Sequence, residues 1–390
     1  MTVERGDAVE LARELVRIDS RNPTLVAGGP GEQTIARALA EVLEAWGFRV
    51  AVHEAAPGRP NVVARIGAGG GASLMFNGHL DVVDTHGMDH PPFDGLERDG
   101  RLYGRGAADM KGGVAAMCAA AVRAADEGFA GEVVVAAVAD EECESIGTSA
   151  LIERGVRADA AIVTEPTRLT IMPAHRGFAW LEVTVHGHAA HGSRYDLGVD
   201  AIRDAALLLA ELDAVEEQTL TARSHALLGR ASLHASRIEG GSGMSTYPDR
   251  CTFWVERRTL PGEDAATALE EMHMVVERVR ARRPALAADV QLLAAQAPSD
   301  VAIDTPIVRA LASAITAGGA QPEIQGMSAW TDAALLNEAG IPAICYGPGD
   351  IALAHSATEW VACAEIEHAT TVLARLARRW CDGGERAWRS

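Results

Sequence analysis

The residues best suited to chemistry in this sequence follow short apolar runs. Three runs end in side chains that can bind metals or move protons, namely His79 with Asp81, Glu141 with Glu142, and Glu165. A fourth run, IPAICYGPG, precedes His355, and Asp109 stands at the expected N-cap of an Ala-rich helix. Because the carboxyl ends of strands in an open α/β sheet line one crevice, these side chains can converge there.

Each of these residues has an ordinary structural explanation when it is taken alone. An H-x-D pair is common, Asp109 could simply cap a helix, and the glutamates could be solvated loop residues. Together they would place five carboxylates and two imidazoles in one crevice without a counter-charge. A pair of divalent cations would balance that charge. The oxygen and nitrogen donors, without sulfur, suit zinc, cobalt or manganese, and two such ions can hydrolyse an amide.

The elements that must position these residues change in pattern along the chain. Strand and helix signals alternate up to about Arg176, which indicates an α/β layer structure. The order then becomes β-α-β-β-α-β, with helices near 198–217 and 263–283, which matches a ferredoxin-like unit. We therefore expect one α/β catalytic domain interrupted by a smaller α+β domain. The expected parts are 1–176 and 295–390 for the catalytic, metal-binding domain and 177–294 for the inserted domain.

A glycine-rich segment, IGAGGGA at Ile66–Ala72, fits the dinucleotide-binding pattern G-x-G-x-x-A. That pattern binds a phosphate only when a helix follows the loop, and here a β run follows instead. We interpret the segment as a hairpin turn. A nicotinamide-dependent oxidoreductase is thus a distant alternative.

Composition excludes several classes of protein. With 48% hydrophobic and 23% charged residues, the chain has a soluble globular composition, and its net charge of −19 argues against a nucleic-acid partner. No apolar run approaches the roughly 20 residues of a membrane span, and the N-terminus does not look like a signal peptide. We therefore expect a cytoplasmic protein. Its six scattered cysteines should be reduced, which disfavours a thiolate zinc site.

Seven motifs together resemble one known family. NGHLDVV, YGRGAADMKGG, ADEE, TEP, HGHAAHGS, RRTLPGE and GPG…AHSATE occur in order over nearly the whole chain. They are similar to motifs of the metallopeptidase and aminoacylase family, which includes acetylornithine deacetylase, succinyl-diaminopimelate desuccinylase, glutamate carboxypeptidase and aminoacylase-1. The resemblance implies a zinc-peptidase-like catalytic domain, an inserted ferredoxin-like domain that serves as lid and dimerisation domain, and two divalent metals, with zinc preferred over cobalt or manganese.

The resemblance also implies a role for each matching residue. The implied metal ligands are His79 and Glu165 for one ion, Glu142 and His355 for the other, and Asp109 as the bridge between them. Asp81 would orient His79. Glu141 would be the general base that takes a proton from a dimetal-bridging water and then protonates the leaving amine. A cis peptide bond between Asp109 and Met110 is implied as well.

The inserted domain should contribute further residues. His191 looks like the histidine that stabilises the developing oxyanion, and the resemblance implies that it does so in the partner subunit of a homodimer. Arg258 looks like the arginine that binds a substrate carboxylate; Arg257 fits the motif less well. Ser245 stands where much of the family has asparagine, which leaves substrate contacts at that position open.

These features predict a metal-dependent amidohydrolase that removes an acetyl- or succinyl-type group from an N-acyl amino acid or related amine. A carboxypeptidase or dipeptidase of the same family is the alternative, because the same chemistry cleaves a peptide bond. A non-catalytic metal-binding protein is a further alternative, which the presence of Glu141 disfavours. The identities of the acyl group and of the amine cannot be read from the sequence.

Overall fold

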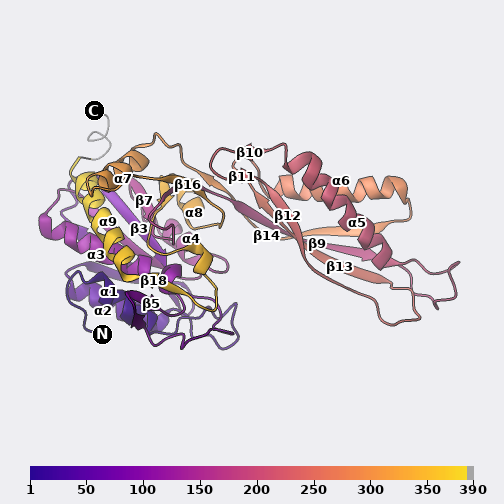
Figure 1. The fold of residues 1–390 in the computed structure, drawn as a ribbon, viewed down its shortest axis with the longest axis horizontal. Coiled ribbons are helices and arrows are strands. Elements are labelled where there is room, and N and C mark those ends of the chain that lie inside the picture. The colour runs from indigo at the N-terminus through magenta and orange to yellow at the C-terminus, as the bar shows by residue number, and fades with distance from the viewer. Residues whose placement is uncertain (384–390) are drawn as a thin grey trace. The chain divides into compact units, whose positions relative to one another are not determined.

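The strand that precedes Glu141 lies inside a mixed β-sheet. In the computed structural model, which describes residues 1–383, the sheet order is β1-β2-β6-β3-β7-β17-β8, and β15 and β16 pair with β8 (Figure 1). The strands are β1 (Arg49–Ala56), β2 (Arg59–Gly67), β3 (Ser73–His79), β6 (Glu132–Val138), β7 (Ala160–Val163), β8 (Ile171–His175), β15 (Ser299–Asp300), β16 (Ile324–Met327) and β17 (Ala343–Cys345).

Four neighbouring strands of this sheet, β6, β3, β7 and β17, run parallel to one another. His79 at the end of β3 pairs with Val138 at the end of β6, so these strands finish at the same edge. The residues that follow the four strands therefore emerge on one side of the sheet, which is the crevice expected of an open α/β sheet.

Helices cover both faces of this sheet. Alternate residues of β6 explain why, since Val133 and Val135 belong to the main core while Val134 and Ala136, which point the other way, are also fully buried. The main core also includes side chains of α1 (Ala8–Val16), α2 (Gln33–Ala45), α3 (Gly112–Glu127), α7 (Pro306–Thr316) and α9 (Cys363–Gly383). Two shorter helices, α4 (Ile146–Glu153) and α8 (Ala333–Glu338), contact each other and the sheet.

The glycine-rich segment Ile66–Ala72 is not a hairpin, so that interpretation was wrong. β6 lies between β2 and β3, and the segment crosses its beginning, where Gly69 and Gly70 donate hydrogen bonds to the carbonyls of Gly131 and Ala130. After Glu132, β6 is apolar up to Val138 and gains most burial between two other strands, and this burial outweighs the local preference for a hairpin. Since β3 follows the segment, the helix that a dinucleotide loop requires is missing here.

The chain divides into two compact units. Unit 1 comprises Met1–Pro173, Val301–Gln325 and the residues from Thr331 onward, and unit 2 comprises Ala174–Asp300 and Gly326–Trp330. Unit 1 also contains a small sheet of order β18-β5-β4. Its strands are β4 (Leu96–Arg98), β5 (Arg101–Tyr103) and β18 (Trp360–Ala362).

Unit 2 has the ferredoxin-like fold that the element order predicted. Its sheet order is β12-β13-β9-β14, with two helices packed on one face, and a small hairpin of β10 and β11 precedes β12. The elements are β9 (Gly177–His186), α5 (Ala201–Val215), β10 (Ser224–His225), β11 (Gly229–Arg230), β12 (Ser232–Gly240), β13 (Arg250–Thr259), α6 (Ala265–Arg282) and β14 (Ala287–Gln296). The mixed α/β fold with an inserted ferredoxin-like domain is thereby confirmed. Within residues 1–383, no helix is long and apolar enough to cross a membrane.

Candidate metal centre

Six of the side chains singled out in the sequence meet at the carboxyl edge of the parallel strands of unit 1. They are His79 at the end of β3, Glu141 and Glu142 after β6, Glu165 after β7, His355 after β17, and Asp109 before α3. All six belong to unit 1. The structure therefore brings residues that are far apart in the sequence into one cluster of carboxylates and imidazoles.

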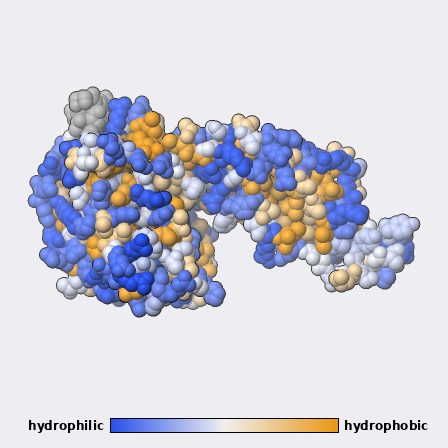
Figure 2. All heavy atoms as spheres, in the orientation of Figure 1, coloured by the Kyte–Doolittle hydropathy of each residue, from blue (hydrophilic) through white to orange (hydrophobic). Residues whose placement is uncertain are grey.

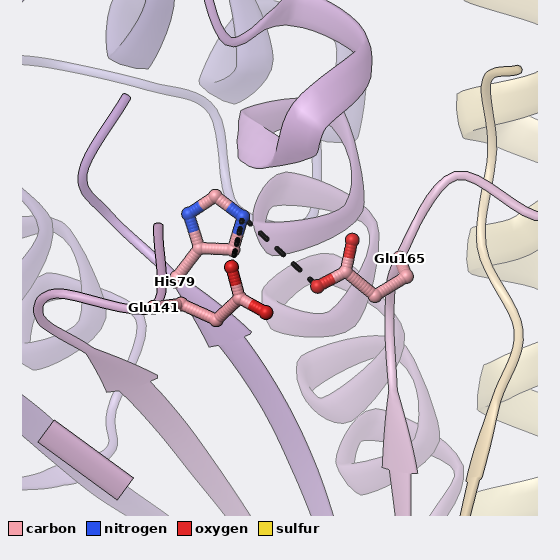
Figure 3. Close-up of side chains that lie close together, drawn as sticks. All are labelled: His79, Glu141 and Glu165. Carbon is pink, nitrogen blue, oxygen red and sulfur yellow. Dashed lines mark ion pairs between the residues drawn. The ribbon is translucent and has the colours of Figure 1, made fainter. Parts of the chain in front are cut away.

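One half of the cluster is centred on His79. Its Nε2 atom lies 3.0 Å from Asp109 Oδ1, 3.9 Å from Glu141 Oε2 and 4.0 Å from Glu165 Oε1. Figure 3 shows both glutamate carboxylates directed at this ring nitrogen. Ligand atoms of His79, Glu141 and Glu165 are close enough to one another to share a single metal ion, and so are those of His79, Asp109 and Glu142.

The other half of the cluster is centred on His355. Its Nε2 atom lies 3.0 Å from Glu142 Oε2 and 3.5 Å from Asp109 Oδ2. Asp109 therefore directs one carboxylate oxygen towards each imidazole, which is the placement a bridging ligand needs. His355 adopts a left-handed backbone conformation (φ 60°), an uncommon one for a residue other than glycine.

The electrostatics of the cluster fit a pair of cations. Burial raises the pKa of Glu141, Glu142 and Glu165, and neighbouring carboxylates raise it further. Hydrogen bonds to Asp109 and Glu142 raise the pKa of His355 to about 10. Glu165 Oε1 is buried and has no hydrogen-bond partner. Two cations would balance the charge of these carboxylates and bind the unpaired Glu165 oxygen. The donor set matches zinc, cobalt or manganese.

Asp109 is held by the chain around it. The expected N-cap role was wrong, because α3 begins at Gly112 with Lys111 as its N-cap, and Asp109 lies in the turn η1 (Ala107–Lys111) before it. The backbone N–H groups of Ala108 and Asp109 donate to Glu359 Oε1, at 3.0 and 3.2 Å. The predicted cis peptide bond between Asp109 and Met110 is present.

The adjacent acids Glu141 and Glu142 are oriented by Asp81. Its two carboxylate oxygens accept the backbone N–H groups of Glu141 at 3.1 Å and of Glu142 at 3.2 Å. The Nδ2 of Asn22 donates to the same carboxylate at 2.8 Å. With their main chain fixed, the two glutamates point to different halves of the cluster, one near His79 and the other near His355.

His79 is oriented by the main chain of Asp81 rather than chiefly by its carboxylate. The Nδ1 of His79 lies 2.9 Å from the Asp81 carbonyl oxygen and 3.6 Å from Asp81 Oδ1. A proton on Nδ1 that is donated to this carbonyl leaves the lone pair on Nε2 directed at the cluster.

Beneath the turn that carries Glu141, a buried ion network fixes Asp140. The Arg59 guanidinium binds Glu32 at 2.5 and 2.6 Å and Asp140 at 2.8 Å. Asn22 donates a further hydrogen bond to Asp140 at 2.8 Å. Asp140 has a positive φ of 68°, and these contacts hold it in that conformation.

Several of these supporting residues were missed by sequence reasoning. They are Asn22, Glu32, Arg59, Arg105, Asp140, Asp332 and Glu359. Arg105 and Glu359 form a buried pair at 2.6 Å and lie within the quoted motifs YGRGAADMKGG and AHSATE, so the motif positions carried that signal. Burial raises the pKa of Asp332 to about 6, and Thr148 donates to its carboxylate at 2.6 Å. Nothing in the local sequence marks Arg59 or Glu32.

The remaining predicted residues belong to unit 2. His191 is exposed, and its backbone pairs with Thr246 in a loop where Gly192 donates to the Ser245 carbonyl at 2.8 Å. Arg257 is buried and bound to Glu263 and Glu271, whereas the Arg258 side chain is 31% exposed. Arg258 is therefore the one of the two arginines that a ligand can reach.

Comparison with known proteins places these features in context. Residues 75–379 match the model of Peptidase family M20/M25/M40. An acetylornithine deacetylase from Myxococcus xanthus is 33% identical over 353 residues, which cover 87% of this chain and 90% of that protein. The N-formyl-4-amino-5-aminomethyl-2-methylpyrimidine deformylase of Bacillus subtilis is 28% identical, with 97% of this chain and 95% of that protein covered.

Solved structures share the fold of the whole chain. The aminopeptidase PepT from Bacillus cereus superposes with a TM-score of 0.79 at 20% identity, covering 99% of this chain and 100% of that one. The Bacillus subtilis YXEP protein, described as a dinuclear metal binding peptidase from the M20 family, superposes with a TM-score of 0.73 at 17% identity, covering 96% and 97%.

Proposed function

Because the chain belongs to Peptidase family M20/M25/M40, a family of hydrolases, we propose that it is a dinuclear metal amidohydrolase. It removes an acyl group of acetyl or succinyl type from an N-acyl amino acid or a related amine. One observation carries this proposal, namely that Asp109 directs one oxygen to His79 and the other to His355. The two halves of the cluster then offer a separate place for each of two cations.

The proposed metal ligands are those that the family resemblance implies. One cation would be held by His79 and Glu165, the other by Glu142 and His355, with Asp109 shared between them. Zinc is the preferred ion, and cobalt and manganese suit the same donors. When bound, the two ions would polarise the amide carbonyl and lower the pKa of the attacking water.

Glu141 does the proton transfer. Its carboxylate lies 3.9 Å from His79 Nε2, next to the ligands, while the hydrogen bond from its N–H to Asp81 fixes its backbone. It takes a proton from the attacking water and delivers that proton to the nitrogen of the departing amine. Burial and the charge of Glu165 raise the pKa of Glu141, which suits a group that must hold the proton between the two steps.

Two observations support acyl amino acids as the proposed substrates. A relative covering most of this chain is named for deacetylation of an amino acid, and another for removal of a formyl group. In unit 2, the partly exposed guanidinium of Arg258 offers a binding group for a substrate carboxylate.

A homodimer formed through unit 2 is part of the proposal. β12 is a nine-residue edge strand that is mostly exposed, and α5 packs beside it. Exposed Ile202 and Leu207 on α5 and Ile238 on β12 make this region apolar, and Figure 2 shows hydrophobic residues gathered on the visible face of unit 2. A long exposed edge and an apolar helix face are both covered when two copies pair.

His191 is proposed to act within that dimer. It lies on an exposed loop of unit 2, and its Nδ1 lies 2.9 Å from Ser193 Oγ, which leaves Nε2 free to donate. In the dimer, His191 of the partner subunit would stabilise the negative charge that develops on the amide oxygen.

The test is a substrate screen on purified full-length protein. The protein is stripped with a chelator and reloaded with zinc, cobalt or manganese, and amine release is measured from N-acetyl, N-succinyl and N-formyl amino acids and from dipeptides. We expect metal-dependent hydrolysis, with kcat/KM for the best acyl amino acid at least about tenfold above that for any dipeptide. Glu141→Ala prepared in parallel controls for contaminating enzymes. A higher kcat/KM for dipeptides would replace the deacylase with a dipeptidase, and equal rates without metal would refute the proposal.

A further inference from the structure

Asp332 is a buried aspartate of unit 1 without a basic partner. It is 1% exposed, and within residues 1–383 its carboxylate forms no ion pair with an arginine, lysine or histidine. Its Oδ1 atom is buried and has no hydrogen-bond partner. Burying a carboxylate without a counter-charge is costly, so this residue calls for a physical explanation.

The place of Asp332 at the start of α8 does not explain its burial. Asp332 is the N-cap residue of this helix, yet its side chain makes no capping hydrogen bond. The backbone N–H of Ala333 donates to Thr331 Oγ1 instead, at 3.3 Å. Since an aspartate at this position usually caps the helix with its carboxylate, the carboxylate of Asp332 has another role.

The carboxylate of Asp332 ends a chain of buried hydrogen bonds that starts on β3. Asn77 Nδ2 donates to Thr148 Oγ1 at 3.2 Å, and the Thr148 hydroxyl donates to Asp332 Oδ2 at 2.6 Å. Each donor polarises the next, so the chain favours a negative charge on Asp332. Because Asn77 precedes His79 by two positions on β3, this chain starts beside a proposed metal ligand.

The fold places Asp332 at the edge of the sheet where the metal cluster lies. α8 contacts β17 and leads into it through the short segment 339–342, so the helix runs antiparallel to the strand and begins near its carboxyl end. Burial raises the pKa of Glu141 and Glu165, and the charge of Asp332 contributes to that rise. The charge of Asp332 therefore reaches the cluster although its carboxylate is not among the ligands.

The sign of this electrostatic effect depends on bound cations. Burial raises the pKa of Asp332 to about 6, although the Thr148 hydroxyl favours its charged form, so Asp332 is ionised at pH 8. Without cations, that charge repels neighbouring carboxylates and destabilises the fold. Divalent cations attract the same charge. The ionisable groups that interact with Asp332 are His79, Asp81, Glu141, Glu165 and Cys345.

We propose that Asp332 binds neither metal ion but strengthens the binding of both through its negative charge. The buried, unpaired carboxylate is held in place by Thr148, at the start of a helix that begins at the cluster's edge of the sheet. This inference rests on the metal pair of the proposed function, but it does not depend on the substrate.

The test compares metal affinity with the stability of the metal-free protein. Full-length wild type and Asp332→Asn are titrated with zinc at pH 8 against a chromogenic chelator, and melting temperatures are measured in excess chelator. Asparagine fills the same space and still accepts the hydrogen bond from Thr148, but it has no charge. We expect Asp332→Asn to bind zinc about 10- to 100-fold more weakly. Without metal, it should melt about 2–4 °C above wild type, because a repulsive charge is removed.

Two further variants separate charge from structure. Thr148→Val keeps the Asp332 charge but removes its hydrogen bond, so it should melt below wild type without metal and bind zinc within about fivefold of wild type. Asp304→Asn removes the charge of an exposed aspartate of unit 1. It should bind zinc within about twofold of wild type and melt within about 1 °C of it.

The inference is overturned if Asp332→Asn binds zinc within threefold of wild type. It is also overturned if this variant melts below wild type without metal, since a purely structural residue lowers stability when it is replaced. A wild-type protein that binds no zinc would refute both this inference and the dinuclear centre. Wild type that binds two ions but hydrolyses none of the screened substrates would refute the deacylase proposal alone, because the affinity comparison still decides the role of Asp332.

Discussion

Asp81 is the residue in which side chain and main chain have separate tasks. Its carbonyl oxygen lies 2.9 Å from His79 Nδ1, while its carboxylate accepts the N–H groups of Glu141 and Glu142. An orienting role towards His79 was implied by the family resemblance. The hydrogen bond from the Glu141 N–H to the Asp81 carboxylate joins residues that are 60 positions apart in the chain. No local sequence pattern reveals such a contact.

We expect Asp81→Ala to lower metal affinity about 10- to 100-fold, as removal of groups that orient ligands typically does. The physical reason is that Glu141 and Glu142 lose the hydrogen bonds that fix their backbone, while the Asp81 carbonyl that contacts His79 is kept. Competition with a chromogenic chelator measures the change. Asp89→Ala, which alters an exposed aspartate nearby, should bind metal like wild type. Unchanged affinity in Asp81→Ala would show that the carboxylate does not support the ligands.

Sequence reasoning was most successful in locating the residues at the strand ends. His79, Glu165 and His355 were expected at one crevice because each follows an apolar strand, and the parallel order of β6, β3, β7 and β17 places them there. The order of the strands in the sheet was harder to predict from the sequence. β6 separates β2 from β3, which no hairpin signal could foretell, since pairing between distant segments is decided by burial of whole strands.

The turn after β6 depends on the buried network of Arg59, Glu32 and Asp140, and we expect Arg59→Met to destabilise unit 1 by about 3–5 kcal/mol. The Arg59 side chain is 10% exposed, so its removal leaves two buried carboxylates without a counter-charge. The loss should shrink at lower pH, because burial raises the pKa of Glu32 and its protonated carboxyl no longer needs that charge. Urea unfolding at two pH values measures both effects.

Arg49→Met serves as the control for this change. Arg49 pairs with Glu132 at the surface and is 63% exposed, so its loss should cost no more than about 0.5 kcal/mol. If Arg59→Met is as stable as Arg49→Met, the network does not hold the turn.

For the whole molecule, the element order was enough to predict a ferredoxin-like unit inserted in an α/β domain, because the periodicities of β9, α5, β12, β13, α6 and β14 are each clear. Unit 2 also gains the short segment Gly326–Trp330, which is distant in sequence and shows no local signal. Association with a second copy remains a proposal, supported by the exposed β12 edge and the apolar side chains beside it.

Subunit complementation tests the proposed dimer and the role of His191 together. His191→Ala and Glu141→Ala should each be inactive alone. If His191 of the partner subunit completes the site, a mixed dimer has one intact site and one site that lacks both groups. Random exchange should therefore restore about a quarter of wild-type activity. Mixed dimers that are demonstrably formed but stay inactive would mean that His191 acts within its own chain or not at all.

The central claim is that two metals bind around Asp109 while Glu141 moves protons without binding either ion. Metal content and hydrolysis are measured on the same samples of wild type, Glu141→Ala and Glu142→Ala. We predict two ions in wild type, two ions with kcat lower by about 100- to 10,000-fold in Glu141→Ala, and loss of one ion in Glu142→Ala. Loss of metal from Glu141→Ala, with both ions and a normal rate retained in Glu142→Ala, would contradict the account.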